Sequence, residues 1–314
     1  MTIKHSPFSL LPEAEAAYQQ WREWKIAAYP KQASEILVEI EKPFDMTQKE
    51  KQKIQSSFIK ANMAIYAIKY TSDFTDKNIV QKLGSDLGLN RLDNNLGADN
   101  DKITSLQVIE GGRKQGYIPY SNLKLSWHTD GYYNLPSEQI RGVILHCVRT
   151  AAEGGENALL DHEMLYIHLR DHNPAYISAL MKSDVLTIPA NIENGVEIRA
   201  AQSGPVFSVE PNSGSLHMRY SARKRNIQWS EDETTTAAVN EIDDFLSSDS
   251  PWILRHRLEP GQGLICNNVL HNRTAFKNSE NELDIEQQRL IYRGRYYDRL
   301  IGTSFNDIEK AMSQ

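Results

Sequence analysis

The sequence predicts a mainly β fold with helical additions, an α+β protein built around a β-sandwich or barrel. From residue 103 onward, apolar runs of strand length recur between Gly, Pro and Asn turns instead of alternating with helices as in βαβ units. The first hundred residues mix helix and strand patterns. Because no linker or repeat interrupts the chain, we expect a single domain over 1–314, with an α+β portion (1–100) packed on a core (101–300).

Local signals place the elements of the first hundred residues. Residues 36–40 alternate like a strand, and 63–70 form a second apolar run. Thr47 and Glu50 make an S/T-x-x-E capping box, so a helix begins near Thr47 and covers 49–64. Apolar residues at helical spacing predict another helix over 78–87, and the polar, turn-rich stretch 93–101 predicts a surface loop.

The remaining two thirds are predicted to be strand-rich. Expected strands cover 103–110, 125–128, 142–149, 185–189, 196–200, 205–210, 215–220, 252–258, 263–267 and 290–297. Helices are expected at 162–171, 174–182 and 233–247, and the polar stretch 272–288 is expected to be the longest loop of this half.

Composition narrows the class of protein. A formal charge of −6 argues against a nucleic-acid binder, because affinity for phosphate backbones comes mainly from clustered Lys and Arg. No stretch approaches the roughly 20 apolar residues of a membrane span, and the first residues lack the apolar core of a secretory signal. Cys147 and Cys266 lie in apolar runs and read as small buried hydrophobes. We therefore expect a cytoplasmic globular protein.

The strongest local motif is His128-Thr129-Asp130, at the end of a predicted strand. Two residues apart on a strand, His128 and Asp130 project to the same face. One imidazole nitrogen and one carboxylate oxygen so placed can occupy two adjacent corners of an octahedral metal site. A lone His-x-Asp is a weak signal, since it arises by chance.

Two further motifs follow in the second half. In the first, a Gly turn enters the apolar run 263–267, which ends in Asn, and His271 follows; alone, His271 could be a surface histidine. In the second, Arg289 opens an otherwise apolar strand. An arginine there could be a solvated strand end, or a fixed cation inside a barrel that would suit a dicarboxylate.

Taken together, these motifs resemble the Fe(II)/2-oxoglutarate-dependent dioxygenases. The order His-x-Asp, a later His and then an Arg on the next strand is most similar to the TauD/TfdA family, and within it to the γ-butyrobetaine-hydroxylase-like branch. The resemblance covers roughly 125–297 and includes the segments 145–147 (LHC), 153–157 (EGGEN) and 271–276 (HNRTAF).

The resemblance implies a double-stranded β-helix (jelly-roll) core with an iron centre. His128, Asp130 and His271 would form the two-His, one-carboxylate facial triad, which leaves three corners open for a bidentate 2-oxo acid and O2. The implied cofactors are Fe(II), 2-oxoglutarate as co-substrate, and O2. In related halogenases the carboxylate ligand is missing, so Asp130 favours hydroxylation of an aliphatic C–H, with release of succinate and CO2.

The resemblance also assigns co-substrate residues. Arg289 matches the arginine that grips the distal carboxylate of 2-oxoglutarate. Arg293 lies four residues later on the same strand face, so it could share this role or contact an acidic substrate. Asn157 stands where relatives often carry a Thr that bonds the co-substrate, and its amide could still donate a hydrogen bond.

The primary substrate is not identified by the sequence beyond a small polar or charged metabolite. Tyr132, Tyr133 and Asn134 follow the metal motif and are expected to border the mouth of the barrel. The aromatic rings could hold a quaternary amine through cation–π contacts, or pack under a lid. The basic cluster 219–225 could be a solvated surface or a contact to an anionic substrate.

Two alternatives stay open at this point. A zinc-dependent hydrolase could use His162, His168 and His172, although Leu169 stands where an H-E-x-x-H motif needs a glutamate. A non-catalytic jelly-roll binding protein would be expected to lose metal ligands or the arginine. A homo-oligomer is plausible by analogy, with a small molecule as the other partner.

Overall fold

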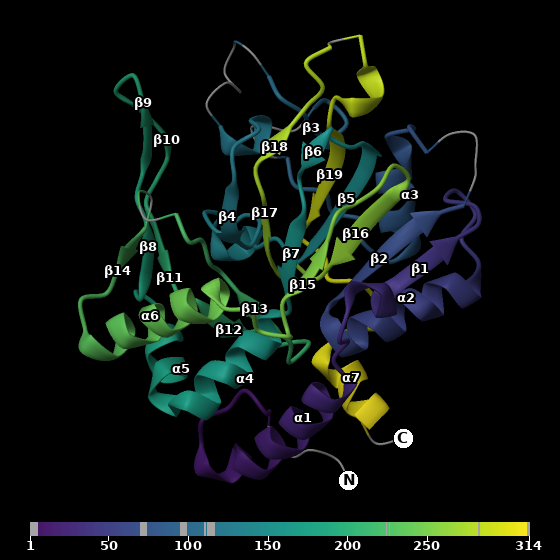
Figure 1. Cartoon of the computed structure of the whole chain (residues 1–314). Coiled ribbons are helices and arrows are strands. Elements are labelled where there is room, and N and C mark those ends of the chain that lie inside the picture. Colours follow the sequence, from purple (N-terminus) through teal and green to yellow (C-terminus); the bar gives the residue numbers. More distant parts are fainter. Residues whose placement is uncertain are drawn as a thin grey trace.

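Two β-sheets form the centre of the molecule (Figure 1). The computed structural model describes residues 6–69, 74–94, 99–109, 111, 117–223, 225, 227–281 and 283–312. The larger sheet has six strands in the order β1 (Leu37–Ile40), β2 (Met63–Ile68), β16 (Gln262–Cys266), β5 (Gly142–Arg149), β19 (Leu290–Tyr296) and β3 (Thr104–Leu106). The smaller has four, in the order β15 (Leu254–His256), β7 (Asn157–Leu160), β17 (Leu270–Arg273) and β4 (Leu125–His128). All their pairings are antiparallel except that of β1 with β2.

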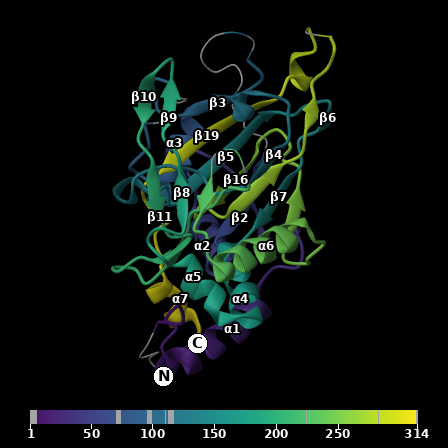
Figure 2. The ribbon, with the colours of Figure 1, turned by 90° about the vertical axis from the view of Figure 1, so that its left-hand side faces the viewer.

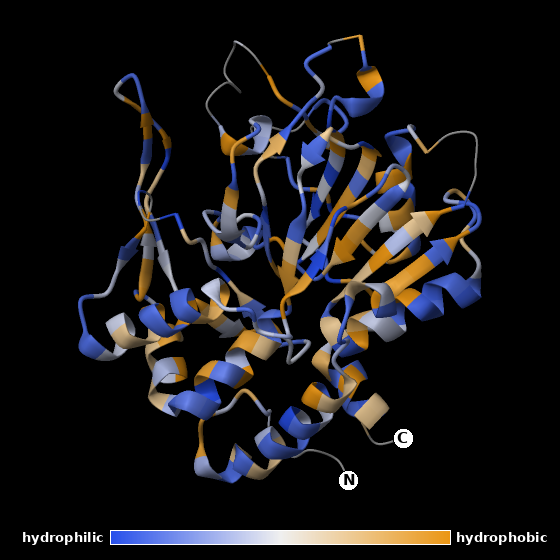
Figure 3. Ribbon diagram, in the orientation of Figure 1, coloured by the Kyte–Doolittle hydropathy of each residue, from blue (hydrophilic) through white to orange (hydrophobic). Residues whose placement is uncertain are grey.

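One hydrophobic core joins the two sheets. It contains Leu145 of β5 and Ile291 of β19 from the larger sheet, and Ala158 of β7 and Leu270 of β17 from the smaller. A second core lies on the other face of the larger sheet, where α2 (Gln48–Ala61) and α3 (Asn78–Asp86) cover it. The inner strands β2, β5 and β16 therefore bury most of their residues on both faces and are largely apolar (Figure 3), whereas the edge strand β1 exposes Glu39.

Helices also gather at one end of the sheets, where both chain termini lie (Figures 1 and 2). They are α1 (Glu15–Ala28), α4 (His162–His172), α5 (Pro174–Leu180), α6 (Glu233–Ser247) and α7 (Phe305–Met312). None of the helices in the described ranges is long and apolar enough to cross a bilayer.

The remaining strands form small sheets around the centre. They are β8 (Leu186–Ile188) between β11 (Gln202–Gly204) and β14 (Gln228–Trp229), the ribbon of β9 (Asn191–Glu193) and β10 (Val196–Arg199), and the pairs β12 (Phe207–Val209) with β13 (Leu216–Met218) and β6 (Glu153–Gly154) with β18 (Phe276–Lys277). The β9–β10 ribbon projects away from the body of the molecule (Figures 1 and 2).

The α+β class is confirmed, and several elements have the predicted bounds. The strands at 125–128 and 142–149 and the helix at 233–247 coincide with β4, β5 and α6. Thr47 caps α2, since its hydroxyl accepts from the Glu50 N–H while the Glu50 carboxylate accepts from the Thr47 N–H.

Other expectations were wrong in detail. Helix α2 ends at Ala61 and not at 64, because Asn62 adopts a left-handed conformation (φ 55°) and β2 follows at once. The expected loop 272–288 begins within β17, which ends at Arg273, and it also contains the short strand β18. In the expected surface loop 93–101, Asp93 is buried and paired with Arg295; residues 95–98 lie outside the described ranges.

Candidate metal centre and co-substrate pocket

The three predicted metal ligands come together where two strands of the smaller sheet pair. His271 in β17 stands directly opposite His128 at the end of β4, with ring centroids 4.3 Å apart. Asp130 lies two residues beyond β4, and its Oδ2 is 3.7 Å from His271 Nε2. All three side chains are buried. The sequence suggested that His271 follows a strand, but His271 lies within the paired strand β17.

Both histidines present the same nitrogen to the centre. The Nδ1 of His128 lies 2.9 Å from the Ser126 carbonyl oxygen, and the Nδ1 of His271 lies 2.9 Å from the Val269 carbonyl oxygen. A carbonyl oxygen accepts and cannot donate, so each Nδ1 carries a proton, and in a neutral ring the Nε2 then keeps its lone pair. Burial, and then the neighbouring His271, lower the pKa of His128 to about 3. A neutral imidazole with a free Nε2 is the form that binds a metal.

Asp130 is held ionised by its surroundings. Burial alone would raise its pKa, but the charge of Arg293, followed by His271 and Arg295, holds the pKa of Asp130 well below its ordinary value. Arg293 Nη1 donates to Asp130 Oδ1 at 3.0 Å, whereas Oδ2 is buried without a hydrogen-bond partner. In the described ranges, no three His, Cys, Asp or Glu side chains are spaced so that they could hold a metal ion as they stand. His128, Asp130 and His271 nonetheless lie close to one another. The buried Oδ2 of Asp130, which has no hydrogen-bond partner, is suited to bind a cation.

Asn268 fixes the position of Asp130. Its Oδ1 accepts from the Asp130 N–H at 2.7 Å, and its Nδ2 donates to the carbonyl oxygens of Asp130 (2.9 Å) and Ile140 (2.7 Å). Asn268 has a left-handed backbone (φ 52°) in the turn between β16 and β17, three residues before His271. Sequence reasoning did not single out this residue, although an Asn ending an apolar strand is a signal for such a turn.

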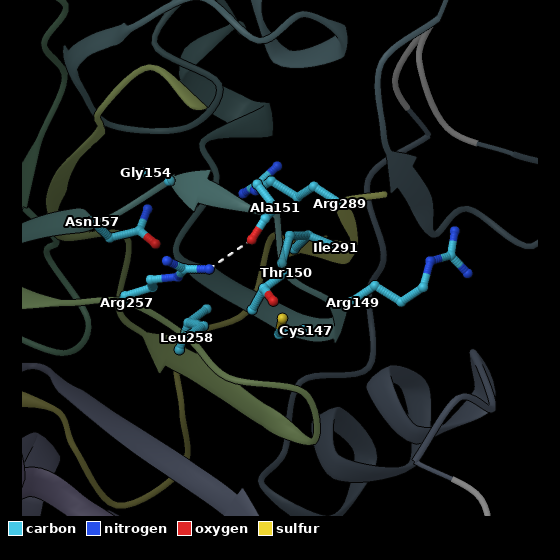
Figure 4. A pocket seen from close by; sticks show the side chains of 11 residues that line it. Cys147, Arg149, Thr150, Ala151, Gly154, Asn157, Arg257, Leu258, Arg289 and Ile291 are labelled. Atoms are coloured by element: carbon cyan, nitrogen blue, oxygen red, sulfur yellow. Dashed lines mark hydrogen bonds between the residues drawn. The ribbon is translucent and has the colours of Figure 1, made fainter. Parts of the chain in front are cut away.

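Arg289 and Asn157 line one narrow pocket (Figure 4). Arg289 is buried, and no carboxylate in the described ranges lies within ion-pair distance of it. The Asn157 Nδ2 donates to the Asn272 carbonyl oxygen at 3.0 Å. Gly155 also lines this pocket, with a backbone φ of 77°, and a Cβ built on it would lie in van der Waals contact with Arg289 Nε at 3.7 Å. The pocket can therefore accept an anion.

The structure separates Arg289 from Arg293. Arg289, which directly precedes β19, lines the pocket, whereas Arg293 within β19 lies against Asp130. Four residues of extended chain correspond to roughly 13 Å, so the two side chains leave the backbone at distant points. Arg293 is thus placed beside the metal donors and Arg289 away from them.

The predicted substrate residues lie in the turn after Asp130, and all three are half-buried. The rings of Tyr132 and Tyr133 meet edge to face, with centroids 5.2 Å apart. Tyr133 also accepts from Arg295 Nη1 at 2.9 Å, and the guanidinium of Arg199 lies 5.7 Å from its ring centroid. The Asn134 side chain donates to the Glu138 carbonyl oxygen and so closes the turn.

Arg219 is buried, so the basic cluster 219–225 is not solvated throughout as one alternative had it. Its guanidinium donates to the carbonyl oxygens of Tyr132 (2.7 Å), Leu186 (2.9 Å) and Gln202 (2.7 Å). It ties the small β8–β11 sheet to the turn after the metal motif and has a positioning role there.

His162 is engaged apart from the other two histidines of the zinc alternative. His162 Nε2 bonds the Leu216 carbonyl oxygen, while His168 Nε2 lies 2.6 Å from Glu241 and His172 Nδ1 3.7 Å from the same carboxylate. His168 and His172 share a helix face as predicted, but His162 is engaged elsewhere. The zinc hypothesis gains no support from this arrangement.

Two buried histidines and one carboxylate that lie close together, with an arginine-lined pocket in the same fold, fit the class of non-haem Fe(II) oxygenases that take a 2-oxo acid. A family model described as "Taurine catabolism dioxygenase TauD, TfdA family" matches residues 73–293, and the chain belongs to this family.

Relatives with known names are uridine-5'-phosphate dioxygenases. The chain is 32% identical to one from Amycolatopsis sp over 156 residues, which are 48% of this chain and 54% of that enzyme. It is 27% identical to one from Streptomyces sp over 200 residues, which are 62% of this chain and 69% of that enzyme. The chain thus matches about half the length of the first relative.

A solved structure shares the fold. It is asparagine oxygenase in complex with Fe(II), 2S,3S-3-hydroxyasparagine and succinate, with a TM-score of 0.54 at 14% identity. The match covers 91% of this chain and 92% of that one. At this identity the likeness shows the fold alone.

Proposed function

We propose that the protein is an Fe(II)- and 2-oxoglutarate-dependent oxygenase that hydroxylates an aliphatic C–H of a small anionic metabolite. The buried, unpartnered Oδ2 of Asp130 between two Nε2-presenting histidines carries the proposal. His128, Asp130 and His271 would hold the iron. The chemistry that bound iron supplies is activation of O2 at the expense of the 2-oxo acid, which leaves as succinate and CO2.

The chain's own residues orient the reactants. Arg289 would pair with the distal carboxylate of 2-oxoglutarate, because it is a buried guanidinium without a carboxylate partner among the described residues. Asn157 lines the same pocket and would border the co-substrate. Arg293 keeps Asp130 ionised and oriented toward the metal.

The architecture proposed with this function is one double-stranded β-helix domain. Supporting this, β4, β5, β7, β16, β17 and β19 pass repeatedly between the smaller and the larger sheet along the chain. The N-terminal strands β1 and β2 extend the larger sheet, which supports a single unit over 1–314. Two buried free cysteines fit the cytoplasmic location proposed from the sequence, and self-association stays a prediction.

The substrate class is proposed from charge. Arg293 and Arg295 are paired with Asp130 and Asp93, but Arg199, which lies 5.7 Å from the Tyr133 ring centroid, has no carboxylate within ion-pair distance among the described residues. The surrounding therefore has no excess negative charge for a quaternary amine and gives no support to the γ-butyrobetaine-hydroxylase-like branch. An anion would be attracted, and the named relatives act on uridine 5'-phosphate. We therefore rank a phosphorylated nucleoside first among candidate substrates.

The first experiment needs no substrate. Fe(II) and then 2-oxoglutarate are added to metal-free protein without oxygen, and the visible spectrum is recorded. A weak metal-to-ligand charge-transfer band that is absent in His128→Ala and Asp130→Ala supports the proposal. Absence of the band in the wild type, with tight Zn(II) binding, would contradict it. Succinate release with uridine 5'-phosphate against uridine then tests the need for a phosphate.

A further inference from the structure

Arg257 enters the co-substrate pocket from a second direction. It directly follows β15, which pairs with β7 so that His256 stands opposite Asn157. This pairing places Arg257 at the pocket that Arg289 reaches from the residue just before β19. In Figure 4 both guanidinium groups extend toward Ala151, whereas the Arg149 side chain extends away from them.

The guanidinium of Arg257 is fixed in place but not saturated. One of its nitrogens, Nη2, donates to the Ala151 carbonyl oxygen at 2.6 Å. An arginine has five N–H donors, so this single bond sets the plane of the group and leaves others for a ligand. No described carboxylate lies within ion-pair distance of Arg257, whereas Arg255, two residues earlier, pairs with Asp249 at 3.6 Å.

Positive charge accumulates around this pocket. Arg273 is buried, and its guanidinium and that of Arg289 lie 4.7 and 5.1 Å from the Phe276 ring centroid. Burial lowers the pKa of Arg289 to about 10, and burial followed by Arg289 lowers the pKa of Arg273 to about 9. Buried cations this close together are stabilised when an anion joins them.

We propose that Arg257 and Arg289 together hold the distal carboxylate of the 2-oxo acid, and that Arg257 makes the pocket selective for dicarboxylates. This inference rests on the proposed function of the site. A carboxylate offers about four lone-pair positions, so one guanidinium can bind both oxygens on one edge while a second binds from the side. A 2-oxo acid without the distal carboxylate would leave both arginines unneutralised.

The test is an anaerobic titration of the Fe(II)-loaded protein, following the charge-transfer band. Arg257→Gln is expected to raise the Kd for 2-oxoglutarate about 10-fold or more, the size of one lost charge-assisted contact. The matched control, Arg255→Gln, changes an exposed arginine two residues away and is expected to leave this Kd within about 2-fold of the wild type. Arg257→Lys keeps the charge and is expected to restore part of the affinity.

Titration with 2-oxobutyrate, which lacks the distal carboxylate, separates recognition from distortion. Arg257→Gln should leave the Kd for 2-oxobutyrate unchanged, so the ratio of the Kd for 2-oxobutyrate to the Kd for 2-oxoglutarate should fall. An unchanged Kd for 2-oxoglutarate, or an equal rise in the Kd values of both acids, overturns the inference. A charge-transfer band in the wild type would still support the proposed function. If Arg257→Gln does not fold, wild-type affinity for 2-oxobutyrate equal to that for 2-oxoglutarate also overturns it. A wild type without any band overturns the proposed function and the inference with it.

Discussion

The side-chain amide of Asn268 pairs with both the N–H and the carbonyl oxygen of Asp130, at 2.7 and 2.9 Å. A residue three positions before one candidate ligand thus holds the backbone of another that lies 138 positions earlier. The distance between Asp130 and His271 depends on this link as well as on the pairing of β4 with β17.

Replacing Asn268 by Ala is expected to weaken Fe(II) binding about 10-fold or more. Three backbone groups lose their partner, so the free energy of unfolding should also fall by about 2–4 kcal/mol. Isothermal titration with Fe(II) and urea unfolding measure the two effects. Asn267→Ala is the matched control, because its buried amide donates to Asn62 and Thr303 and not to Asp130. Equal Fe(II) affinity in both variants would contradict a positioning role for Asn268.

Arg289 and Arg293 are expected to differ in their effect on co-substrate binding. Arg289→Gln should raise the Kd for 2-oxoglutarate about 10- to 100-fold, since it removes a buried charge-assisted pair. Arg293→Gln should change this Kd less than about 3-fold, because its side chain is engaged with Asp130. The same anaerobic titration measures both variants. If Arg293→Gln had the larger effect, the roles of the two arginines would be reversed.

Lys25 is expected to be required for stability. Its Nζ lies 2.6 Å from both Asp161 and Glu163, and all three side chains are essentially inaccessible to solvent. Lys25→Met leaves two buried carboxylates without their ion-pair partner, so the free energy of unfolding should fall by about 3–5 kcal/mol.

The midpoint of urea unfolding checks this prediction. Lys51→Met, which breaks a more exposed pair with Asp86, should cost less than about 1 kcal/mol. The double change Lys25→Met with Glu163→Gln should recover part of the lost stability. A Lys25→Met protein as stable as the Lys51→Met control would show that the buried triad contributes little.

Glu50 should make stability fall in acid. Burial alone would raise its pKa, but hydrogen bonds from Thr47 and from the N–H groups of Glu41 and Thr47 outweigh it and lower the pKa. A lowered folded-state pKa means that this stabilisation is complete above the unfolded pKa of about 4.3 and is lost as pH falls through the folded value. Glu50→Gln should be less stable at pH 7 by about 1 kcal/mol.

Urea unfolding of the wild type and Glu50→Gln between pH 7 and pH 3 tests this linkage. The two free energies should converge as the pH falls, because protonation removes from the wild type what the substitution has already removed. A constant difference over the whole range would show that the charge of Glu50 does not stabilise the cap.

Local signals were sufficient wherever one stretch of chain decides its own conformation. The Thr47–Glu50 capping box closes within four residues, and the strands β4 and β5 were predicted with their observed bounds. Helix α1 escaped prediction because it begins without a side-chain cap, so its start carries no local signal. The candidate metal ligands could also be recognised in the sequence, because imidazole and carboxylate side chains are typical ligands of such metals.

The tertiary structure alone decided what depends on distant pairings. It placed His271 opposite His128, turned Asp93 inward onto Arg295, and brought Arg257 to the pocket of Arg289. None of these contacts joins residues within one local window, and a charged residue in a polar stretch looks the same whether it is solvated or buried against a counter-charge. The sequence by itself indicated the class and a candidate donor set, whereas strand pairing and burial decided which charged side chains lie at the site.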